Sequence, residues 1–441
     1  MKLLIYVHKL STRTQYIFGL ICHELLGLEI DITEQKEEFL SYQGPKFSYA
    51  PEPLGNEVFV QCNGLLAEKG ITEQPIDFVT FQGHPAFFGT TDSRSVFSFD
   101  FFAAAFYLVT RYEEYLPFKQ DEYGRFPVIE SVAAKGGFLR IPVINVWTEM
   151  FGKELQKRYP EMAFIERKFR FVPTIDIDHA YAYKHRNFFR TVGGIGHTIL
   201  KRRWKQLIQK LKVLMGLAKD PYDTYEYIHH VHKERHVKAL FFVLFAQHSR
   251  HDNNVSLKNR VFRHLLKSLA HRGAVGIHPS LGSNKRFTKL ENEVTGLSEV
   301  LGYKIAISRQ HFLKVSFPKT YQNLINVGIK HDYSMGYASE PGFKASIADP
   351  FKFYNLTNET ETGLTIHPIT LMDVTLRDYY RLDASNGTEL SKAMIDAVRA
   401  VDGEFVSLWH NESFSETGRW KNWRKVYEDV LAYATDKSTR K

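Results

Sequence analysis

The sequence of 441 residues contains only two cysteines, Cys22 and Cys62. Two cysteines cannot form a disulfide framework or a thiolate metal cluster, and this scarcity favours a reducing compartment. The chain also lacks any apolar run long enough to span a membrane. Its first apolar run is short and precedes a basic, polar stretch without a small-residue cleavage site, so we interpret residues 2–7 as a β-strand. We therefore expect a cytoplasmic protein that can lie at the inner membrane surface.

Acidic residues are absent from residues 179–219, which contain ten lysines and arginines. Subtracting these ten charges from the net charge of +9 leaves −1 for the rest of the chain. The high pI of about 9.1 therefore reflects one segment and does not indicate a nucleic-acid partner.

The basic segment contains an amphipathic helix, which we expect over residues 200–217. Its apolar positions recur at helical spacing: Leu200, Trp204, Leu207, Ile208, Leu211 and Leu214. The basic residues between them are Lys201, Arg202, Lys205 and Lys212. Such a helix can pack on its own domain with a solvated basic face, which is the interpretation we favour. Alternatively, it makes peripheral contact with an anionic membrane.

Residues 1–165 are expected to form a smaller N-terminal α/β domain of unknown role. Strands are predicted at KLLIYV and EVFVQC, and helices at residues 12–26 and 101–116. The segment RYEEYLPFKQDEYGRFP, residues 111–127, is rich in Arg, Glu and Tyr. It can provide a binding surface, but we favour structural ion pairs at the junction with the next domain.

Residues 166–441 alternate between predicted strands and helices. This alternation indicates parallel strands joined by crossover helices. The number of alternating strands and helices favours a (β/α) barrel over an open sheet. Polar residues follow the predicted strands at their carboxyl ends: Asp176, Asp178, His278, Arg309, His311 and His410. Active sites of such barrels lie at that end of the strands.

Asp176 and Asp178 are two positions apart on one strand, so both carboxylates face the same side. Two neighbouring carboxylates repel each other unless a cation or an arginine lies between them. A carboxylate and imidazoles converging from separate strands are typical of a divalent-metal site, zinc in particular. We therefore assign Asp178 as a metal ligand and Asp176 as a free general base.

The motifs TIDID, GIHPS, SRQHF, HDYSMGY and SLWHN occur in this order. In these motifs the chain resembles the polysaccharide deacetylases, which are metal-dependent enzymes that remove N- or O-acetyl groups from glycans. The closer resemblance is to a bacterial subgroup with an extra N-terminal α/β domain. The resemblance implies a distorted (β/α) barrel of about seven parallel strands over residues 166–441. It also implies an acetylated carbohydrate as substrate.

The family's residue roles carry over to five positions. The resemblance implies that Asp176 is the catalytic base and that Asp178 and His278 bind the metal, which is expected to be zinc. Arg309 corresponds to the arginine that pairs with the base, and His410 to the general acid.

The family's second histidine ligand has no counterpart here, because Gly282 stands at its position. We assign His311 as the third ligand, with His179 and His367 as alternatives. The chain is accordingly expected to be a metal-dependent carbohydrate deacetylase. The alternative is a catalytically inactive, deacetylase-like protein that binds glycans or acts as a scaffold.

Overall fold

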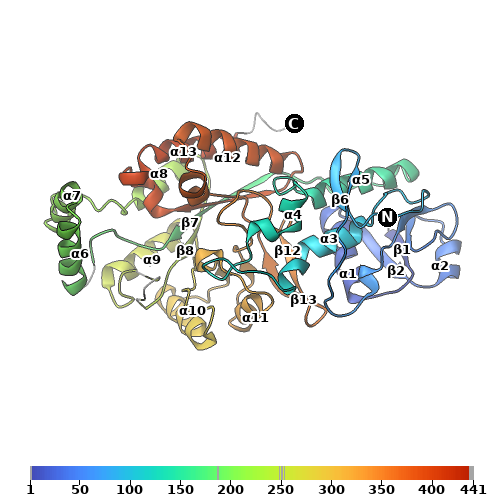
Figure 1. Ribbon diagram of the computed structural model, residues 1–441, viewed down its shortest axis with the longest axis horizontal. Coiled ribbons are helices and arrows are strands. Elements are labelled where there is room, and N and C mark those ends of the chain that lie inside the picture. The colour runs from blue at the N-terminus through green and yellow to red at the C-terminus, as the bar shows by residue number, and fades with distance from the viewer. Residues whose placement is uncertain (1, 186–187, 248, 250–251, 253, 437–441) are drawn as a thin grey trace.

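The computed structural model describes residues 2–185, 188–247, 249, 252 and 254–436. The molecule is elongated (Figure 1). An N-terminal α/β unit lies at one end, a large sheet with its covering helices occupies the middle, and a helical hairpin lies at the other end.

The N-terminal unit contains a four-stranded parallel sheet with the order β2-β1-β3-β4. Its strands are β1 (Lys2–Val7), β2 (Glu29–Thr33), β3 (Lys46–Ala50) and β4 (Val58–Gln61). Leu3 and Ile5 enter the main core on one face of β1, and Leu4 and Tyr6 pack with Phe39 on the other. Because both faces of β1 are covered, its sequence is a continuous apolar run instead of an alternating one.

The helices predicted in this unit are present but end in different helical forms. The segment expected at 12–26 comprises α1 (Thr12–Phe18) and the π-helical η1 (Gly19–Leu25). The segment expected at 101–116 comprises α3 (Phe101–Val109) and the 3₁₀ turn η3 (Tyr112–Tyr115). Arg111 separates α3 from η3 because its φ of 55° is left-handed and interrupts the helix.

The second sheet has nine strands in the order β12-β13-β11-β10-β9-β8-β7-β15-β14. Neighbouring strands are parallel except β12, which pairs antiparallel with β13. The strands are β7 (Arg170–Ile177), β8 (Leu240–Val243), β9 (Ala274–Ile277), β10 (Ile307–Ser308), β11 (His331–Asp332), β12 (Phe351–Asn355), β13 (Thr360–Ile366), β14 (Leu371–Met372) and β15 (Glu404–His410). The predicted alternation of parallel strands and helices is thus confirmed. The predicted closure is not, because within the described residues the hydrogen-bonded order ends at β12 and β14.

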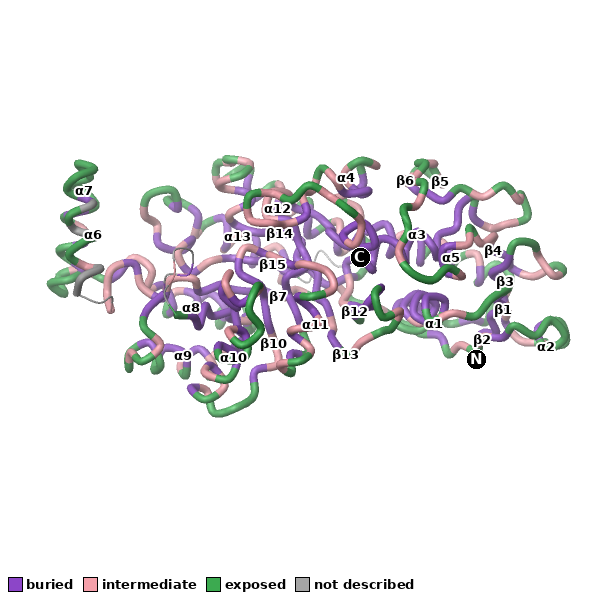
Figure 2. Tube along the Cα trace, turned by 60° about the horizontal axis from the view of Figure 1, so that its bottom comes forward, coloured by how far each residue is buried: buried purple, intermediate pink, exposed green. Residues whose placement is uncertain are grey.

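Helices cover this sheet and bury its strands (Figure 2). They are α8 (Tyr225–Glu234), α9 (Arg260–Arg272), α10 (Phe287–Leu301), α11 (Lys319–Asn326), α12 (Ala384–Arg399) and α13 (Trp423–Thr435). Strand β15, which lies between β7 and the edge strand β14, is buried from Glu404 to Trp409, and His410 at its end is the first partly exposed residue. Among the helices in the described part of the chain, none is both long and apolar enough to cross a membrane.

Buried ion pairs connect the N-terminal unit to the large sheet. Arg111 Nη2 lies 2.7 Å from Glu113 Oε1, and Arg111 Nε lies 2.8 Å from Glu114 Oε1. Lys344, from the second half of the chain, approaches the same Glu114 carboxylate at 3.0 Å. These contacts confirm the interpretation of residues 111–127 as a source of ion pairs at the junction.

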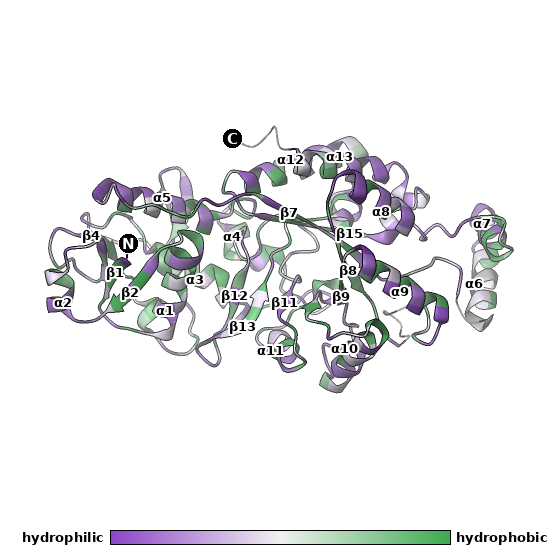
Figure 3. Cartoon of the chain, turned by 180° about the vertical axis from the view of Figure 1, so that it is seen from behind, coloured by the Kyte–Doolittle hydropathy of each residue, from purple (hydrophilic) through white to green (hydrophobic). Residues whose placement is uncertain are grey.

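The basic segment forms a helical hairpin between β7 and α8. Its helices are α6 (Phe188–Leu200) and α7 (Trp204–Leu214), so the single helix expected over 200–217 is shorter and has a partner. The hairpin stands off from the body of the molecule (Figures 1 and 3). Trp204, Ile208 and Leu211 are exposed, so the favoured interpretation of a helix packed on its own domain is wrong.

Candidate metal and active site

Asp176 and Asp178 lie at the carboxyl end of β7, an interior strand of the large sheet. β7 lies between β8 and β15, and Asp176 is opposite His410 in the register of β15. A cavity of about 240 Å³ opens beside this end of the strands, and both carboxylates line it together with His278, His311 and His410. The tertiary structure therefore places the predicted side chains at one site.

Asp176 is held by the guanidinium of Arg309. Arg309 Nη1 donates hydrogen bonds to Asp176 Oδ1 at 2.7 Å and to Thr174 Oγ1 at 2.6 Å. Its Nε donates to the carbonyl oxygen of Tyr333 at 2.8 Å, and its Cζ lies 4.3 Å from the ring centroid of Phe242. Because the arginine is fully buried and its side chain is fixed on several sides, it places positive charge beside Asp176 in a defined geometry.

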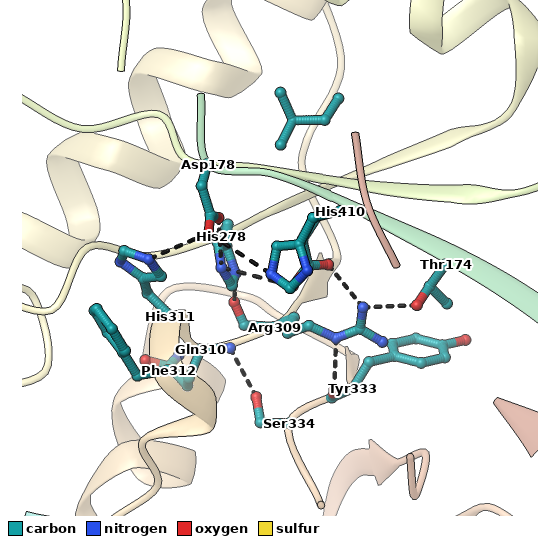
Figure 4. A network of polar contacts seen from close by, with 12 residues as sticks. Thr174, Asp178, His278, Arg309, Gln310, His311, Phe312, Tyr333, Ser334 and His410 are labelled. Atoms are coloured by element: carbon teal, nitrogen blue, oxygen red, sulfur yellow. Dashed lines mark hydrogen bonds and ion pairs between the residues drawn. The ribbon is translucent and has the colours of Figure 1, made fainter. Parts of the chain in front are cut away.

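Asp178, His278 and His311 form a group that can hold a metal ion (Figure 4). Asp178 Oδ1 lies 3.2 Å from His278 Nε2, and Asp178 Oδ2 lies 3.5 Å from His311 Nε2. The Nδ1 atoms face other partners. His278 Nδ1 lies 2.6 Å from the carbonyl oxygen of Arg309, and His311 Nδ1 lies 3.1 Å from Asp252 Oδ1. These partners fix both rings with Nε2 toward Asp178, as outer-shell acceptors do in metal sites.

The donor set fits a divalent cation. Asp178 Oδ1 is buried and has no hydrogen-bond partner among the described residues. If both histidines are neutral and donate through Nδ1, their Nε2 lone pairs point at an anionic carboxylate, which is unfavourable without a positive charge between them. One carboxylate oxygen and two imidazole nitrogens match in number and type the three protein ligands that catalytic zinc sites use.

Electrostatics lead to the same conclusion. Burial alone would raise the pKa of Asp178, but His311 and His278 outweigh it and hold that pKa well below the usual value. Burial likewise opposes a charge on His311, yet Asp178 and Asp252 raise its pKa to about 9. A proton on His311 and a bound divalent metal are therefore alternative ways to supply the positive charge that Asp178 requires.

His410 forms a second pair with Asp373. His410 Nδ1 lies 2.9 Å from Asp373 Oδ1, and the backbone N–H of His410 donates to Asp373 Oδ2 at 2.8 Å. Burial opposes a charge on this histidine, but Asp373, followed by Asp178 and Asp176, raises its pKa to about 10. His410 Nε2 points toward Asp178, with 3.7 Å between Nε2 and Oδ2. A protonated imidazole thus faces the metal group.

Sequence reasoning missed two supporting carboxylates. Asp373 follows the short strand β14, so it satisfies the same rule of a polar residue at a strand end that identified the other site residues. Asp252 lies in the loop after β8, where no strand-end or helical pattern distinguishes it from other loop residues. Burial would raise its pKa, but the hydrogen bond to His311 and those from Leu281 and Ser249 lower it to about 2.

The N-terminal unit also contributes to the cavity. Tyr123 and Arg125 line it, and the Tyr123 ring stacks on Phe312 with 4.9 Å between centroids. Arg125 Nη1 donates to the carbonyl oxygen of Phe312 at 3.0 Å. The residues after η3 therefore reach across to the turn η5 (His311–Leu313), which carries the third candidate ligand.

The other candidate ligands lie elsewhere. His367 Nδ1 lies 2.7 Å from Glu404 at the start of β15, the opposite end of that strand from His410. Gly282 and His179 are not among the residues that line the cavity. Of the alternatives considered for the missing ligand, the structure brings only His311 to Asp178 and His278 within the part of the chain that it describes.

Asp332 supports the neighbouring strand and does not face the metal group. It accepts hydrogen bonds from Ser308 Oγ at 2.7 Å and from the backbone N–H of Ser334 at 2.9 Å. Burial raises its pKa to about 6. The acid thus orders the ends of β10 and β11 next to Arg309.

Comparisons with known proteins give one family match and several similar solved structures. A family of unknown function, DUF7033, matches residues 3–160. No curated protein matches the chain. Among solved structures it is similar to a Mycobacterium smegmatis protein described as a polysaccharide deacetylase (15% identity, 60% of this chain and 85% of that chain, TM-score 0.39). It is also similar to Puue allantoinase (10% identity, 61% and 84%, TM-score 0.38) and to a polysaccharide deacetylase of Bacillus cereus (12% identity, 59% and 88%, TM-score 0.26).

Proposed function

We propose that this chain is a metal-dependent hydrolase that removes acetyl groups from a bacterial sugar or polysaccharide. The observation that carries this proposal is the arrangement of three candidate ligands between an arginine-bound carboxylate and an aspartate-bound histidine. Asp178, His278 and His311 would hold the metal, and zinc suits this set of oxygen and nitrogen donors. When bound there, zinc would polarise the acetyl carbonyl and make a water molecule more acidic.

Asp176 is the proposed general base. Arg309 occupies Asp176 Oδ1, while Oδ2 lies 3.7 Å from His278 Nε2, at the metal group. An ionised carboxylate held in this way can accept the proton of a water molecule that attacks the acetyl carbon. The fixed guanidinium pairs with the carboxylate and prevents it from turning away.

His410 is the proposed general acid. Its raised pKa keeps the imidazole protonated at neutral pH, and its Nε2 faces the cavity side on which Asp178 lies. It can therefore donate a proton to the leaving amine or alkoxide of the sugar. Asp373 accepts the hydrogen bond from Nδ1 and so fixes which nitrogen faces the substrate.

The walls of the cavity suit a sugar ring. Tyr123, Phe312 and Tyr379 offer aromatic surface, and Arg125 and Arg419 add hydrogen-bond donors. A pocket that combines apolar walls with a few polar groups is typical of small-molecule sites.

We place the reaction in the cytoplasm, close to the inner membrane surface, and the free thiols of Cys22 and Cys62 fit a reducing compartment. Recovery of the protein from the periplasm would contradict this placement.

The first test is metal content, measured by inductively coupled plasma mass spectrometry on protein purified without chelators. We expect close to one zinc per chain, lost in Asp178→Asn and His311→Ala. His264→Ala, at an exposed position of α9, is the matched histidine control and should keep its metal. Release of acetate from acetylated glycans should follow metal content across these variants.

The second candidate function, motivated by Gly282 in place of a histidine ligand, is a glycan-binding or scaffold protein without activity. Absence of zinc, cobalt or nickel after loading, together with retained glycan binding, would replace the hydrolase with this alternative. Bound metal without acetate release from any acetylated glycan would instead show that the site holds metal for another purpose.

Asp252→Asn tests whether Asp252, which is not itself a candidate ligand, positions the third ligand His311. Loss of the carboxylate that holds His311 Nδ1 should weaken zinc binding by about 10- to 100-fold. A competition titration with a chromophoric chelator measures this change. A thermal melt must accompany it, because Asp252 also accepts the backbone N–H of Leu281. Unchanged zinc affinity in a folded variant would exclude the positioning role.

A further inference from the structure

The hairpin of α6 and α7 carries an apolar face that nothing in the described structure covers. We call this the hairpin face; it consists of Leu200, Trp204, Ile208, Leu211 and Met215, with side chains 81%, 57%, 54%, 38% and 64% exposed. The four residues from Trp204 onward are spaced by four, three and four, so they form one stripe along α7. Large apolar side chains gathered at one place on a surface indicate an interaction site.

A different face of α7 holds the hairpin together. Leu207 and Val213 are buried, and Lys210 Nζ reaches the carbonyl oxygen of Thr191 in α6 at 3.4 Å. At about 100° per residue, Leu207, Lys210 and Val213 lie roughly 70°, 130° and 170° around the helix from the centre of the hairpin face. The exposed stripe is therefore not needed for the packing of α6 against α7.

The charges around the hairpin face define the chemistry of its partner. Lys201, Arg202, Arg203, Lys205 and Lys212 are all exposed, and residues 179–219 contain no acidic residue. Two copies of the hairpin would repel each other, so self-association through this face is disfavoured. The partner must offer negative charge together with apolar material along the whole length of a helix.

A membrane surface with anionic lipids has both properties. Interfacial helices bury an apolar stripe at the level of the headgroups and keep lysines and arginines at its border, where each contributes attraction to anionic lipid. Tryptophan favours the same depth because its ring is amphipathic. The hairpin also projects beyond the body of the molecule, so a flat surface can reach it (Figures 1 and 2).

We propose that the hairpin face docks this protein on anionic membrane surfaces. The hairpin is inserted directly after β7, the strand that ends in Asp176 and Asp178. Docking would therefore attach the protein through the connection that leaves the candidate active site. This proposal does not depend on the proposed hydrolase activity.

Trp204 provides a built-in reporter for the test. The other four tryptophans, Trp147, Trp409, Trp420 and Trp423, are buried. With the full-length protein and vesicles of phosphatidylcholine containing 30% phosphatidylglycerol, we expect a blue shift of tryptophan emission and protection from acrylamide quenching. Both effects should be absent with pure phosphatidylcholine vesicles and should weaken as salt is added.

Three variants separate the contributions in a vesicle co-sedimentation assay. Charge reversal of Lys201, Arg202 and Lys205 to Glu, and replacement of Trp204 and Ile208 by Ser, should each weaken partitioning by about tenfold or more. All five side chains are exposed, so folding should be retained, and a thermal melt checks this. Reversal of Lys258, Arg260 and Lys267, exposed near or on α9, is the matched charge control and should leave partitioning unchanged.

Partitioning that is unchanged by both hairpin variants would overturn the proposal. Lack of binding to anionic vesicles would overturn it as well. If the Trp204 and Ile208 replacements instead shift the molar mass in light scattering, while vesicles are not bound, the face is an interface between copies. Acetate release measured in detergent-free solution reports on the hydrolase separately, so the two proposals can fail independently.

Discussion

The pairing of His410 with Asp373 makes the acid of the proposed reaction depend on one buried carboxylate. Burial lowers the pKa of His410, but Asp373 makes the largest contribution in the other direction, and the pKa rises to about 10. In Asp373→Asn the pKa of His410 should fall toward the ordinary value of about 6.5. The alkaline limb of the kcat/KM profile should then move to lower pH, with at least a roughly tenfold loss at pH 8.

A pH–rate profile of acetate release, measured on zinc-loaded protein, tests this shift. Asp402→Asn is the control, because Asp402 is exposed and its left-handed φ of 49° suits asparagine. A variant that loses activity equally at every pH would show that Asp373 supports the fold and does not tune His410.

His232 affects stability in the acid range. Burial lowers its pKa to about 4, and its Nε2 contacts the hydroxyl of Tyr427. The unfolded chain binds a proton at about pH 6.5 and the folded chain does not, so the free energy of unfolding falls as pH decreases from 6.5 to 4. When the pH is lowered from 7 to 4.5, the free energy of unfolding of His232→Gln should therefore decrease by roughly 2 to 3 kcal/mol less than that of the wild type.

Urea denaturation at the two pH values measures this difference. His264→Gln, at an exposed position of α9, should lose as much stability as the wild type. An equal decrease in the free energy of unfolding for all three proteins would mean that protonation of His232 does not destabilise the folded state.

At the scale of elements, the site depends on how closely β9 and its neighbours pack. A Cβ atom on Gly276 would lie 2.8 Å from the carbonyl oxygen of Ile307 in β10 and 2.9 Å from the Phe242 ring in β8. That ring packs against Arg309, and His278 follows Gly276 by two residues. Gly276→Val should therefore destabilise the protein by about 1–3 kcal/mol and reduce zinc binding.

Gly363 in β13 offers a matched control, because its Cβ would have no atom within 4 Å. Gly363→Val should be neutral or slightly stabilising, since valine favours strands. Guanidinium denaturation and zinc content of both variants provide the measurement. Equal stability of the two variants would show that β9 and β10 can separate without affecting the site.

At the scale of the whole molecule, Arg111 joins the two halves of the chain. It is fully buried, pairs with Glu113 and Glu114, and donates to the hydroxyl of Tyr337 at 3.0 Å. Arg111→Met would leave two buried carboxylates without their arginine, with Lys344 still beside Glu114. We therefore expect the free energy of unfolding to decrease by about 3–5 kcal/mol.

Arg94→Met is the control for Arg111→Met, because Arg94 pairs with Asp92 at the surface. This substitution should lower the free energy of unfolding by less than about 1 kcal/mol. Guanidinium denaturation followed by tryptophan fluorescence reports on both halves, through Trp147 in one and Trp409 in the other. A separate early transition at Trp147 in the variant would show that the N-terminal unit had lost its coupling to the sheet.

The hairpin shows where a sequence pattern stops being informative. The spacing of Trp204, Ile208 and Leu211 determines an amphipathic helix whether that helix packs on its own domain or stands away from it. Only the position of α7 relative to the rest of the chain decides between these outcomes. The sequence therefore predicted the helix correctly, but its surroundings incorrectly.

Local patterns determined much of the candidate site, because Asp176, Asp178, His278 and His410 each end an apolar strand and strand direction places them at one edge. The tertiary structure decided the rest. Asp252 and Asp373 approach His311 and His410 from distant segments, and Tyr123 crosses from the N-terminal unit. Contacts between residues far apart in the chain leave no periodic trace in the sequence, so which histidine joins Asp178 and His278, and what surrounds them, follows only from the folded chain.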